Sequence, residues 1–224
     1  MKKLLTIFIV IAVSLAMNVS FADAATTEEV WAWGYNGNGQ LGNGTTTNSN
    51  VPLQVTGLTD ATAIAAGYLH SLAVKSDGTI WAWGDNALGQ LGDGTTTDNS
   101  APVQVSGLTG VIAIAGGNQH SLAVKSDGTV WAWGSNALGQ LGDGTTTSSS
   151  TPVQVNGLTG AIGVAAGLMH SLAVKSDGTV WAWGLNNNGQ LGDGTPDSSN
   201  VPVQVSGLTG AITIGAGYNH SLAA

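Results

Sequence analysis

Residues 120–134 read HSLAVKSDGTVWAWG, and residues 170–184 repeat that string without a change. Residues 70–84 differ from it only at Ile80. Apolar residues alternate with small or polar ones on both sides of the Ser-Asp-Gly triplet, which is the period of a β-strand. The triplet itself is a tight turn signal, because glycine readily adopts a positive φ. The string therefore predicts two antiparallel strands joined by a hairpin.

The string is part of a unit that occurs four times at intervals of fifty residues. WAWG begins at Trp31 and GQLG at Gly39, and both recur at each interval, together with P-x-Q-V and HSLA. Within one unit, the segments around 70–75, 79–84, 102–105 and 112–115 alternate as four short strands, and no window is free enough of glycine, proline or alternation to predict a helix. Four-stranded units at this period predict an all-β fold, a β-propeller built from four repeats.

The side chains of the repeat suit neighbouring blades that interlock large residues into small ones. Trp81 and Trp83 share one face of their strand, while Ile80 and Ala82 share the other. We interpret the eight tryptophans as core residues, with a sugar-stacking platform as the alternative. A straight solenoid is the rival architecture, but it needs polar capping repeats and none of the four units resembles a cap.

The two ends of the chain carry complementary halves of one blade. The first strand signal is EEVWAWG at 28–34, and the chain ends on HSLAA at 220–224. We predict a last blade made of PVQV at 202–205, AITIGAG at 211–217 and HSLAA, closed by the N-terminal WAWG strand, because closure removes open sheet edges. The alternative is a fragment whose continuation would read KSDGTVWAWG.

Residues 1–24 have the pattern of a secretory signal peptide. A Met-Lys-Lys start precedes an apolar run from Leu4 to Ala16, and Ala22-Asp23-Ala24 suits cleavage near Ala24. An uncleaved anchor is the alternative, and no later segment is apolar enough to insert into a membrane. We expect a secreted, periplasmic or cell-surface protein whose propeller spans 25–224.

Composition narrows the classes of partner. Cleavage after Ala24 leaves three lysines, no arginine and twelve acidic residues, a net charge of −9. Such a chain lacks the basic surface that nucleic acid or anionic lipid requires, so we expect no nucleic-acid partner. Without cysteine, its stability rests on packing alone.

The combination of WAWG, GQLG, P-x-Q-V and A-G-x-x-H-S-L-A resembles the repeat of the regulator-of-chromosome-condensation (RCC-type) family in all four units. The resemblance implies a propeller with one repeat per blade and a split closing blade. Well-known members have seven blades, so a closed four-bladed monomer, a homodimer and a partial chain all stay open here. The nuclear namesake is a nucleotide exchange factor that binds chromatin, roles that export and acidity argue against. Exported bacterial members, some of which bind and inhibit β-lactamases through a loop face, are the better analogy.

The repeated histidines are the strongest candidates for chemistry. A ring of four imidazoles could hold a metal ion; we interpret them instead as structural residues that bond a neighbouring backbone group and fasten the blade. This set is His70, His120, His170 and His220. The serine after each histidine points to the opposite face of its strand, so the two cannot form a nucleophile–base pair. Asp93, Asp143 and Asp193 are interpreted as turn residues. We predict no enzyme, no cofactor and no metal.

Differences between the four units predict where a partner would bind. Because successive strands are antiparallel, the connections after IAIA and after WAWG emerge on one rim, and the constant SDGT and GLTG turns on the other. The variable rim carries Tyr35, Tyr68, Leu69, Asp85, Asn118, Gln119, Leu168, Met169, Leu185, Tyr218 and Asn219. We therefore expect a secreted, non-enzymatic binding or scaffold propeller that recognises a protein partner, or a glycan, through this rim. The alternatives are a structural module of a larger exported surface protein, and a metal-dependent enzyme that uses the histidine ring.

Overall fold

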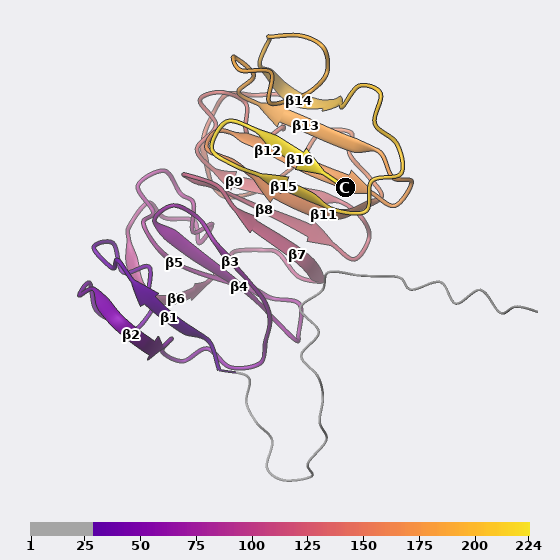
Figure 1. Cartoon of the computed structure of the whole chain (residues 1–224). Helices are drawn as coiled ribbons and strands as arrows, with labels where there is room; N and C mark the ends of the chain where they lie inside the picture. Colours follow the sequence, from indigo (N-terminus) through magenta and orange to yellow (C-terminus); the bar gives the residue numbers. More distant parts are fainter. Residues whose placement is uncertain (1–28) are drawn as a thin grey trace, which may run out of the picture.

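The computed structural model describes residues 29–224, and this part of the chain is built from β-strands with no helix. The predicted signal peptide and its cleavage point near Ala24 lie outside the described residues. No candidate for a membrane-spanning helix occurs in the described range. The predicted all-β architecture of repeated blades is confirmed (Figure 1).

Three complete blades are four-stranded antiparallel sheets, and each follows the chain order of its strands. The first contains β3 (Ala61–Ala66), β4 (His70–Lys75), β5 (Ile80–Gly84) and β6 (Asn99–Gln104). The second contains β7 (Val111–Gly116), β8 (His120–Lys125), β9 (Val130–Gly134) and β10 (Ser149–Gln154). The third contains β11 (Ala161–Ala166), β12 (His170–Lys175), β13 (Val180–Gly184) and β14 (Ser199–Gln204).

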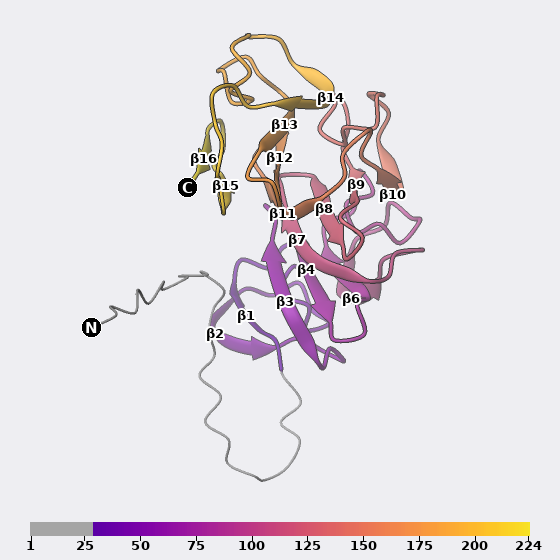
Figure 2. The ribbon, with the colours of Figure 1, turned by 90° about the vertical axis from the view of Figure 1, so that its right-hand side faces the viewer.

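Two half-blades flank the complete blades. The N-terminal half-blade pairs β1 (Trp31–Gly34) with β2 (Ser49–Gln54), and the C-terminal half-blade pairs β15 (Ile214–Ala216) with β16 (Ser221–Ala223). Figure 2 shows the blades following one another in an arc, with the two half-blades at its separate ends.

The predicted hairpin has the geometry that its sequence requires. In the first blade His70 faces Gly84 and Val74 faces Ile80 across the β4–β5 pair. Gly78 has φ 75° in the turn, and its amide donates to the Lys75 carbonyl at 2.8 Å. The Asp77 carboxylate accepts from the Thr79 amide at 2.9 Å, which closes the turn.

Tryptophans fill the spaces between blades, as the large-into-small pattern predicts. Trp133 is fully buried in one cluster with Leu72, Ile80 and Ala82 of the preceding blade. Trp83 and Trp183 occupy the equivalent places, so the core interpretation holds for this tryptophan of each complete blade. Trp81, Trp131 and Trp181 are half-buried and pack against the edges of the clusters. The core interpretation is wrong for the N-terminal half-blade, where Trp31 is 49% and Trp33 63% exposed.

The predicted closure of the last blade is not present in this structure. Within residues 29–224, β1 pairs only with β2, and β16 pairs only with β15. Assigning PVQV at 202–205 to the last blade was also wrong, because β14 pairs with β13, with Gln204 opposite Trp181. The C-terminal half-blade therefore lacks two outer strands rather than one, and the N-terminal half-blade consists of those two strands.

Candidate binding site

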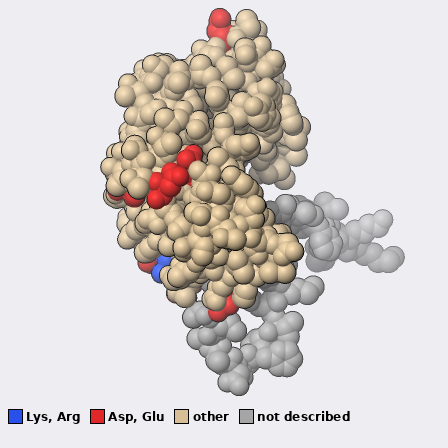
Figure 3. All heavy atoms as spheres, turned by 90° about the vertical axis from the view of Figure 1, so that its left-hand side faces the viewer, with Lys and Arg blue, Asp and Glu red and all other residues tan. Residues whose placement is uncertain are grey.

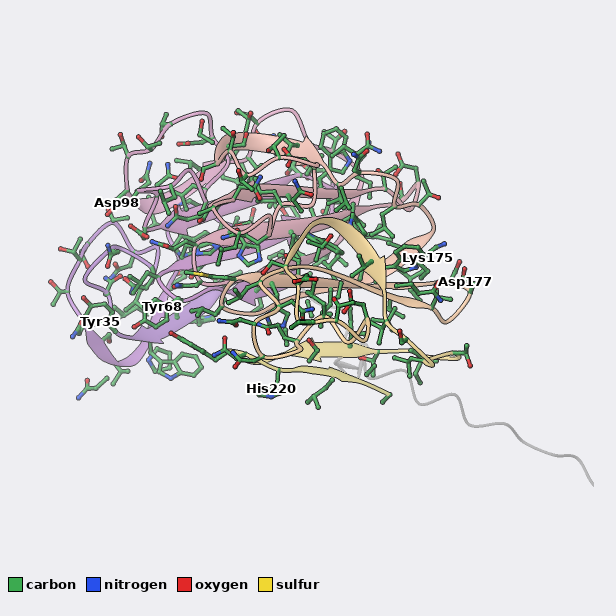
Figure 4. All side chains as sticks on the ribbon, turned by 90° about the horizontal axis from the view of Figure 1, so that it is seen from above. Tyr35, Tyr68, Asp98, Lys175, Asp177 and His220 are labelled. Atoms are coloured by element: carbon green, nitrogen blue, oxygen red, sulfur yellow. The ribbon has the colours of Figure 1, made fainter. Side chains whose placement is uncertain are left out.

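Backbone hydrogen bonds place the loops on two rims. The Asp85 amide donates to the Leu69 carbonyl at 2.9 Å, so the β3–β4 connection and the end of β5 lie together on the variable rim. The Ser76 amide donates to the Asp60 carbonyl at 2.8 Å, so the SDGT and GLTG turns share the opposite, constant rim. The predicted two-rim arrangement is confirmed. In Figure 4, Tyr35 and Tyr68 lie at one end of the molecule, and Asp177 of an SDGT turn lies at the other.

A hollow of about 250 Å³ opens on the variable rim, where the innermost strands of four successive blades end. Backbone bonds join these strand ends across the blades, such as Tyr68 N to Gly117 O at 3.1 Å and Leu168 N to Tyr218 O at 3.2 Å. The hollow is lined by Tyr68, Gly116, Gly117, Asn118, Ala166, Gly167, Leu168, Ala216, Gly217 and Tyr218. Glycine and alanine line much of its wall, and its larger side chains come from variable positions.

The larger side chains of the hollow offer mixed chemistry. Tyr68 is 72% and Tyr218 66% exposed, while Leu168 and Asn118 are half-buried. The hollow can therefore offer two phenol groups, an amide and an aliphatic side chain to one ligand. Large exposed aromatic residues of this kind are enriched in recognition surfaces.

The other predicted rim residues do not line this hollow. Tyr35 borders a separate cavity beside the N-terminal half-blade, and Asn219 borders one beside the C-terminal half-blade. Half-buried positions outside the hollow are Leu69, Gln119, Met169 and Leu185. Asp85 is buried and accepts from the Gln90 side chain, so it presents little surface to a partner. Burial, and then the nearby Asp98 carboxylate, raise the pKa of Asp85.

The histidines are structural, as predicted, but they link adjacent blades, and the sequence analysis did not predict this linkage. His70 Nε2 lies 2.9 Å from Ser121 Oγ of the next blade, and the His120–Ser171 and His170–Ser221 pairs repeat this contact. The Ser121 hydroxyl donates to the Gln90 carbonyl at 2.8 Å, so it must accept from His70. The imidazole therefore carries its proton on Nε2. The bond expected to a backbone group is thus made to a serine hydroxyl.

Burial keeps the linked histidines neutral. His70 and His120 are almost fully buried, which lowers their pKa values to about 4 and about 3. The buried hydroxyls of Ser121 and Ser171 are directed at carbonyl oxygens, so no reacting atom can approach these histidine–serine pairs. Among the described residues, no three metal-binding side chains gather into one group.

A second set of structural residues was also missed. Asn86 is fully buried; its Oδ1 accepts from Leu91 N at 2.9 Å and its Nδ2 donates to the Thr97 carbonyl at 3.1 Å. The equivalent asparagines in the other repeats are Asn36, Asn136 and Asn186. Their invariance across four units was the available signal. Asp93 accepts from Thr95 N at 2.9 Å, which confirms its interpretation as a turn residue.

The chain is similar to known proteins in both sequence and structure. A family model described as RCC1-like domain matches residues 4–223. Yeast RCC1 (Prp20), solved bound to Kap60, is 25% identical with a TM-score of 0.74, and the match covers 87% of this chain and 49% of that one. For Prp20p from Saccharomyces cerevisiae, described with its binding to Gsp1p and histones, the values are 25%, 0.73, 87% and 51%. For human WBSCR16 they are 26%, 0.78, 87% and 52%.

The chain thus spans about half the length of each of these solved structures. Its blades superpose on those of larger propellers, and the motifs WAWG, GQLG and HSLA recur in all four units. The family match extends over nearly the whole sequence. The chain belongs to the RCC1-like domain family.

Proposed function

We propose that this chain is a secreted, non-enzymatic propeller that binds a protein partner through the hollow of the variable rim. The observation that carries the proposal is the composition of that hollow. The units share their WAWG, GQLG and HSLA motifs but differ at Tyr68, Asn118, Leu168 and Tyr218, and these four residues line a single cavity. Structural needs are similar in every repeat, so differences among the side chains of one cavity fit recognition better than folding.

The relatives support a protein as the class of partner. Yeast RCC1 was solved bound to Kap60, and Prp20p is described with its binding to Gsp1p and histones. A glycan is the second ligand class within this proposal, because tyrosines can stack on sugar rings. We do not expect a polyanion as the partner, since the described chain has only three lysines. Figure 3 shows one face of the molecule, on which uncharged residues dominate and acidic atoms outnumber basic ones.

Binding rather than catalysis is part of the proposal. The histidine–serine pairs hold blades together and are buried, and the hollow is lined by no carboxylate or imidazole. Secretion, and an exported bacterial type of family member, rest on the signal pattern of residues 1–24. Expression of the full chain followed by mass measurement of the exported form tests this part: a mass corresponding to residues 25–224 is expected. A full-length mass in the cytoplasmic fraction would contradict it.

A paired variant tests the binding site. Replacing Tyr68 and Tyr218 by serine removes the two exposed phenols of the hollow, and both side chains are mostly exposed to solvent. The bait is the immobilised 25–224 chain, and the probes are an array of purified secreted and cell-surface proteins and an array of glycans. We expect at least one protein probe to bind the parent chain and to lose 10-fold or more in affinity for the variant, because exposed tyrosines are typical hot-spot residues.

The matched control replaces two exposed apolar residues away from the variable rim. Ile112 and Ile162 are 53% and 49% exposed, and each is the second residue of a strand that starts at the constant rim. Their replacement by serine should leave binding unchanged. Equal loss in both variants, or binding that neither variant affects, would contradict the assignment. Binding to glycans alone would replace the protein partner by a carbohydrate.

We also propose that the chain associates with a second copy of itself. Support comes from the edges of β1 and β16, which within residues 29–224 pair only with β2 and β15. The contacts that such an association would make follow from the geometry of the complete blades.

A further inference from the structure

A cavity of about 290 Å³ lies between the third blade and the C-terminal half-blade. Leu172, Gln190, Leu191, Gly192, Val205, Leu208 and Leu222 are among its lining residues. Between complete blades the equivalent space holds a tryptophan. Trp133 packs with Leu91, Val105 and Leu108, which are the residues one hundred positions before Leu191, Val205 and Leu208. The cavity is therefore a tryptophan slot.

Hydrogen bonding and glycine contacts identify the same slot. Trp133 Nε1 donates to the Gln90 carbonyl at 2.8 Å, and Trp183 Nε1 to the Gln140 carbonyl at 2.9 Å. A Cβ added at Gly92 would lie 2.7 Å from Trp133 Nε1, whereas one at Gly192 would meet only Val205. The Gln190 carbonyl and the space beside Gly192 are thus placed to receive an indole, and no tryptophan within residues 29–224 occupies this position.

The opposite end of the arc carries the matching side chain. Trp33 is the repeat equivalent of Trp133 and Trp183, yet it is 63% exposed, and it lies on β1, which pairs only with β2 in the part of the chain that the structure describes. At the slot, Leu222 on the free edge of β16 is 65% exposed. An exposed strand edge with large apolar residues is a surface that other chains pair with. Each chain therefore carries one slot in its C-terminal half-blade and, in its N-terminal half-blade, the exposed tryptophan whose repeat equivalents fill such slots. Figure 2 shows the two half-blades at separate ends of the arc.

We infer that a second copy of this chain completes the split blade, with Trp33 of the second copy in the slot of the first. The register follows from β8 and β9, in which Ser121 faces Trp133, Leu122 faces Ala132 and Ala123 faces Trp131. By the fifty-residue repeat, Leu222 of one copy faces Ala32 of the other, and Ser221 faces Trp33. Trp33 Nε1 then donates to the Gln190 carbonyl across the interface. This inference rests on the self-association proposed above and is independent of the ligand.

A second contact on the other side of the composite blade repeats the histidine linkage. His170 bonds Ser221 across fifty-one positions, so His220 would bond Ser71 of the second copy. The Ser71 hydroxyl donates to the Gln40 carbonyl at 2.8 Å, as the Ser121 hydroxyl does to the Gln90 carbonyl. Its oxygen is therefore oriented to accept a hydrogen bond from a histidine. A cavity of about 260 Å³ borders Ser71, Gln40 and Gly67, where the C-terminal half-blade of the other copy would pack.

The two ends of one chain are complementary, so contact between two copies is head-to-tail. A pair that closes into a ring uses both ends of each copy. A head-to-tail interface closes into a ring when the rotation allows it. Two copies contribute three complete blades each and share two composite blades, which makes a ring of eight.

Cysteine cross-linking tests the register, because the chain contains no cysteine of its own. Residues that face each other across antiparallel strands have Cα atoms about 4.5–5.5 Å apart, which suits a disulfide. A chain with Ala32→Cys is mixed with a chain carrying Leu222→Cys and oxidised mildly. We expect a covalent heterodimer, whereas each variant alone should give none, because like ends do not meet.

The out-of-register control pairs Ala32→Cys with Ala223→Cys, whose side chains point to opposite faces of the sheet. It should cross-link at least 10-fold less. Equal cross-linking in both mixtures, or none in either, would overturn the inference. So would an intrachain disulfide in the Ala32→Cys, Leu222→Cys double variant at nanomolar concentration, because that result means closure within one chain.

Solution mass tests the slot itself. By light scattering and sedimentation equilibrium, the 25–224 chain should have the mass of a dimer. Trp33→Ala should raise the dissociation constant of the dimer at least 10-fold. The variant stays folded, because Trp33 is exposed in the single chain. Ile112→Ala, with a comparable exposed apolar residue, is the control and should dimerise like the parent. A parent chain that is monomeric at all concentrations would overturn the inference, while failure to find a ligand would not affect these measurements.

Discussion

At the scale of single residues, Asp60 stands out for its backbone conformation. Its φ is 61°, and it is the one residue other than glycine in the left-handed region among residues 29–224. The equivalent positions in the other units are Gly110, Gly160 and Gly210, with φ between 70° and 75°. A residue with a Cβ is disfavoured in this region, although aspartate tolerates it better than most.

Replacing Asp60 by glycine should therefore stabilise the fold. The conformational cost of the left-handed region is removed, and the extra freedom of glycine in the unfolded chain offsets part of that gain. The Thr59 hydroxyl bond to the Asp60 carboxylate is exposed and adds little. We expect a gain of about 0.5–1 kcal/mol in the free energy of unfolding, measured by urea titration, because the cost of the left-handed region for a residue with a Cβ is larger than the entropic cost of glycine. The reverse change, Gly110→Asp, should destabilise by a similar amount, and a loss of stability in Asp60→Gly would refute this account.

At the scale of strands, the histidine–serine pairs hold the inner part of one blade against the next. His120 on β8 donates from Nε2 to Ser171 Oγ on β12 at 3.0 Å, and the Ser171 hydroxyl donates to the Gln140 carbonyl at 2.8 Å. Both residues are fully buried. A buried donor left without an acceptor costs more than a hydrogen bond contributes, so the pair is more sensitive to removal than an exposed contact.

Ser171→Ala should lower the free energy of unfolding by about 1–3 kcal/mol, because it leaves the His120 Nε2–H buried without an acceptor. Ser71→Ala is the matched control, since Ser71 makes the same bond to Gln40 but receives no histidine within the described chain. Both are compared by urea unfolding on the Trp33→Ala background, in which the proposed self-association is weakened. Equal losses in the two variants would mean that the histidine contact contributes nothing.

At the scale of the whole molecule, periodicity predicts much of the architecture. The fifty-residue period and the alternation around Trp81 and Trp83 were enough to predict strands, blades and the two rims, because antiparallel order alone decides on which rim a loop emerges. The period cannot show where a sheet begins, since any cyclic shift of four strands gives the same repeat. That is why the PVQV strand at 202–205 was placed in the wrong blade.

The candidate site was harder to predict than the fold. The side chains around the hollow come from variable positions that comparison of the units identified, among them Tyr68 and Leu168. Asp85 occupies an equally variable position but folds inward onto Gln90, and variability carries no information on burial. The His70–Ser121 contact joins neighbouring sheets, so the alternation of a single strand could not indicate it.

The buried histidines also predict how the whole propeller responds to acid. Burial lowers the pKa of His70 and of His170 to about 4, and that of His120 to about 3, from an ordinary value of 6.5. Between about pH 6.5 and pH 4, the three histidines are therefore protonated in the unfolded chain but neutral in the folded chain. Their contribution to the free energy of unfolding is fully present above about pH 6.5. It falls as the pH drops toward 4, with a slope of about 1.4 kcal/mol per pH unit for each histidine. The carboxylates of Asp77, Asp127 and Asp177, whose pKa values are lowered by bonds from threonine, lose their contribution only at lower pH.

Urea unfolding of the Trp33→Ala chain between pH 7 and pH 5 measures this slope. His120→Gln should reduce the slope by about one third, whatever it does to the absolute stability, because one of three equivalent proton-linked groups is gone. His70→Gln should do the same, while the double variant should keep about one third of the slope. The raised pKa of Asp85 acts in the opposite direction, since its protonation stabilises the fold as the pH falls. A slope near zero that is the same in the parent, His120→Gln and His70→Gln chains would contradict this account, because the folded chain would then take up protons at these imidazoles as readily as the unfolded chain.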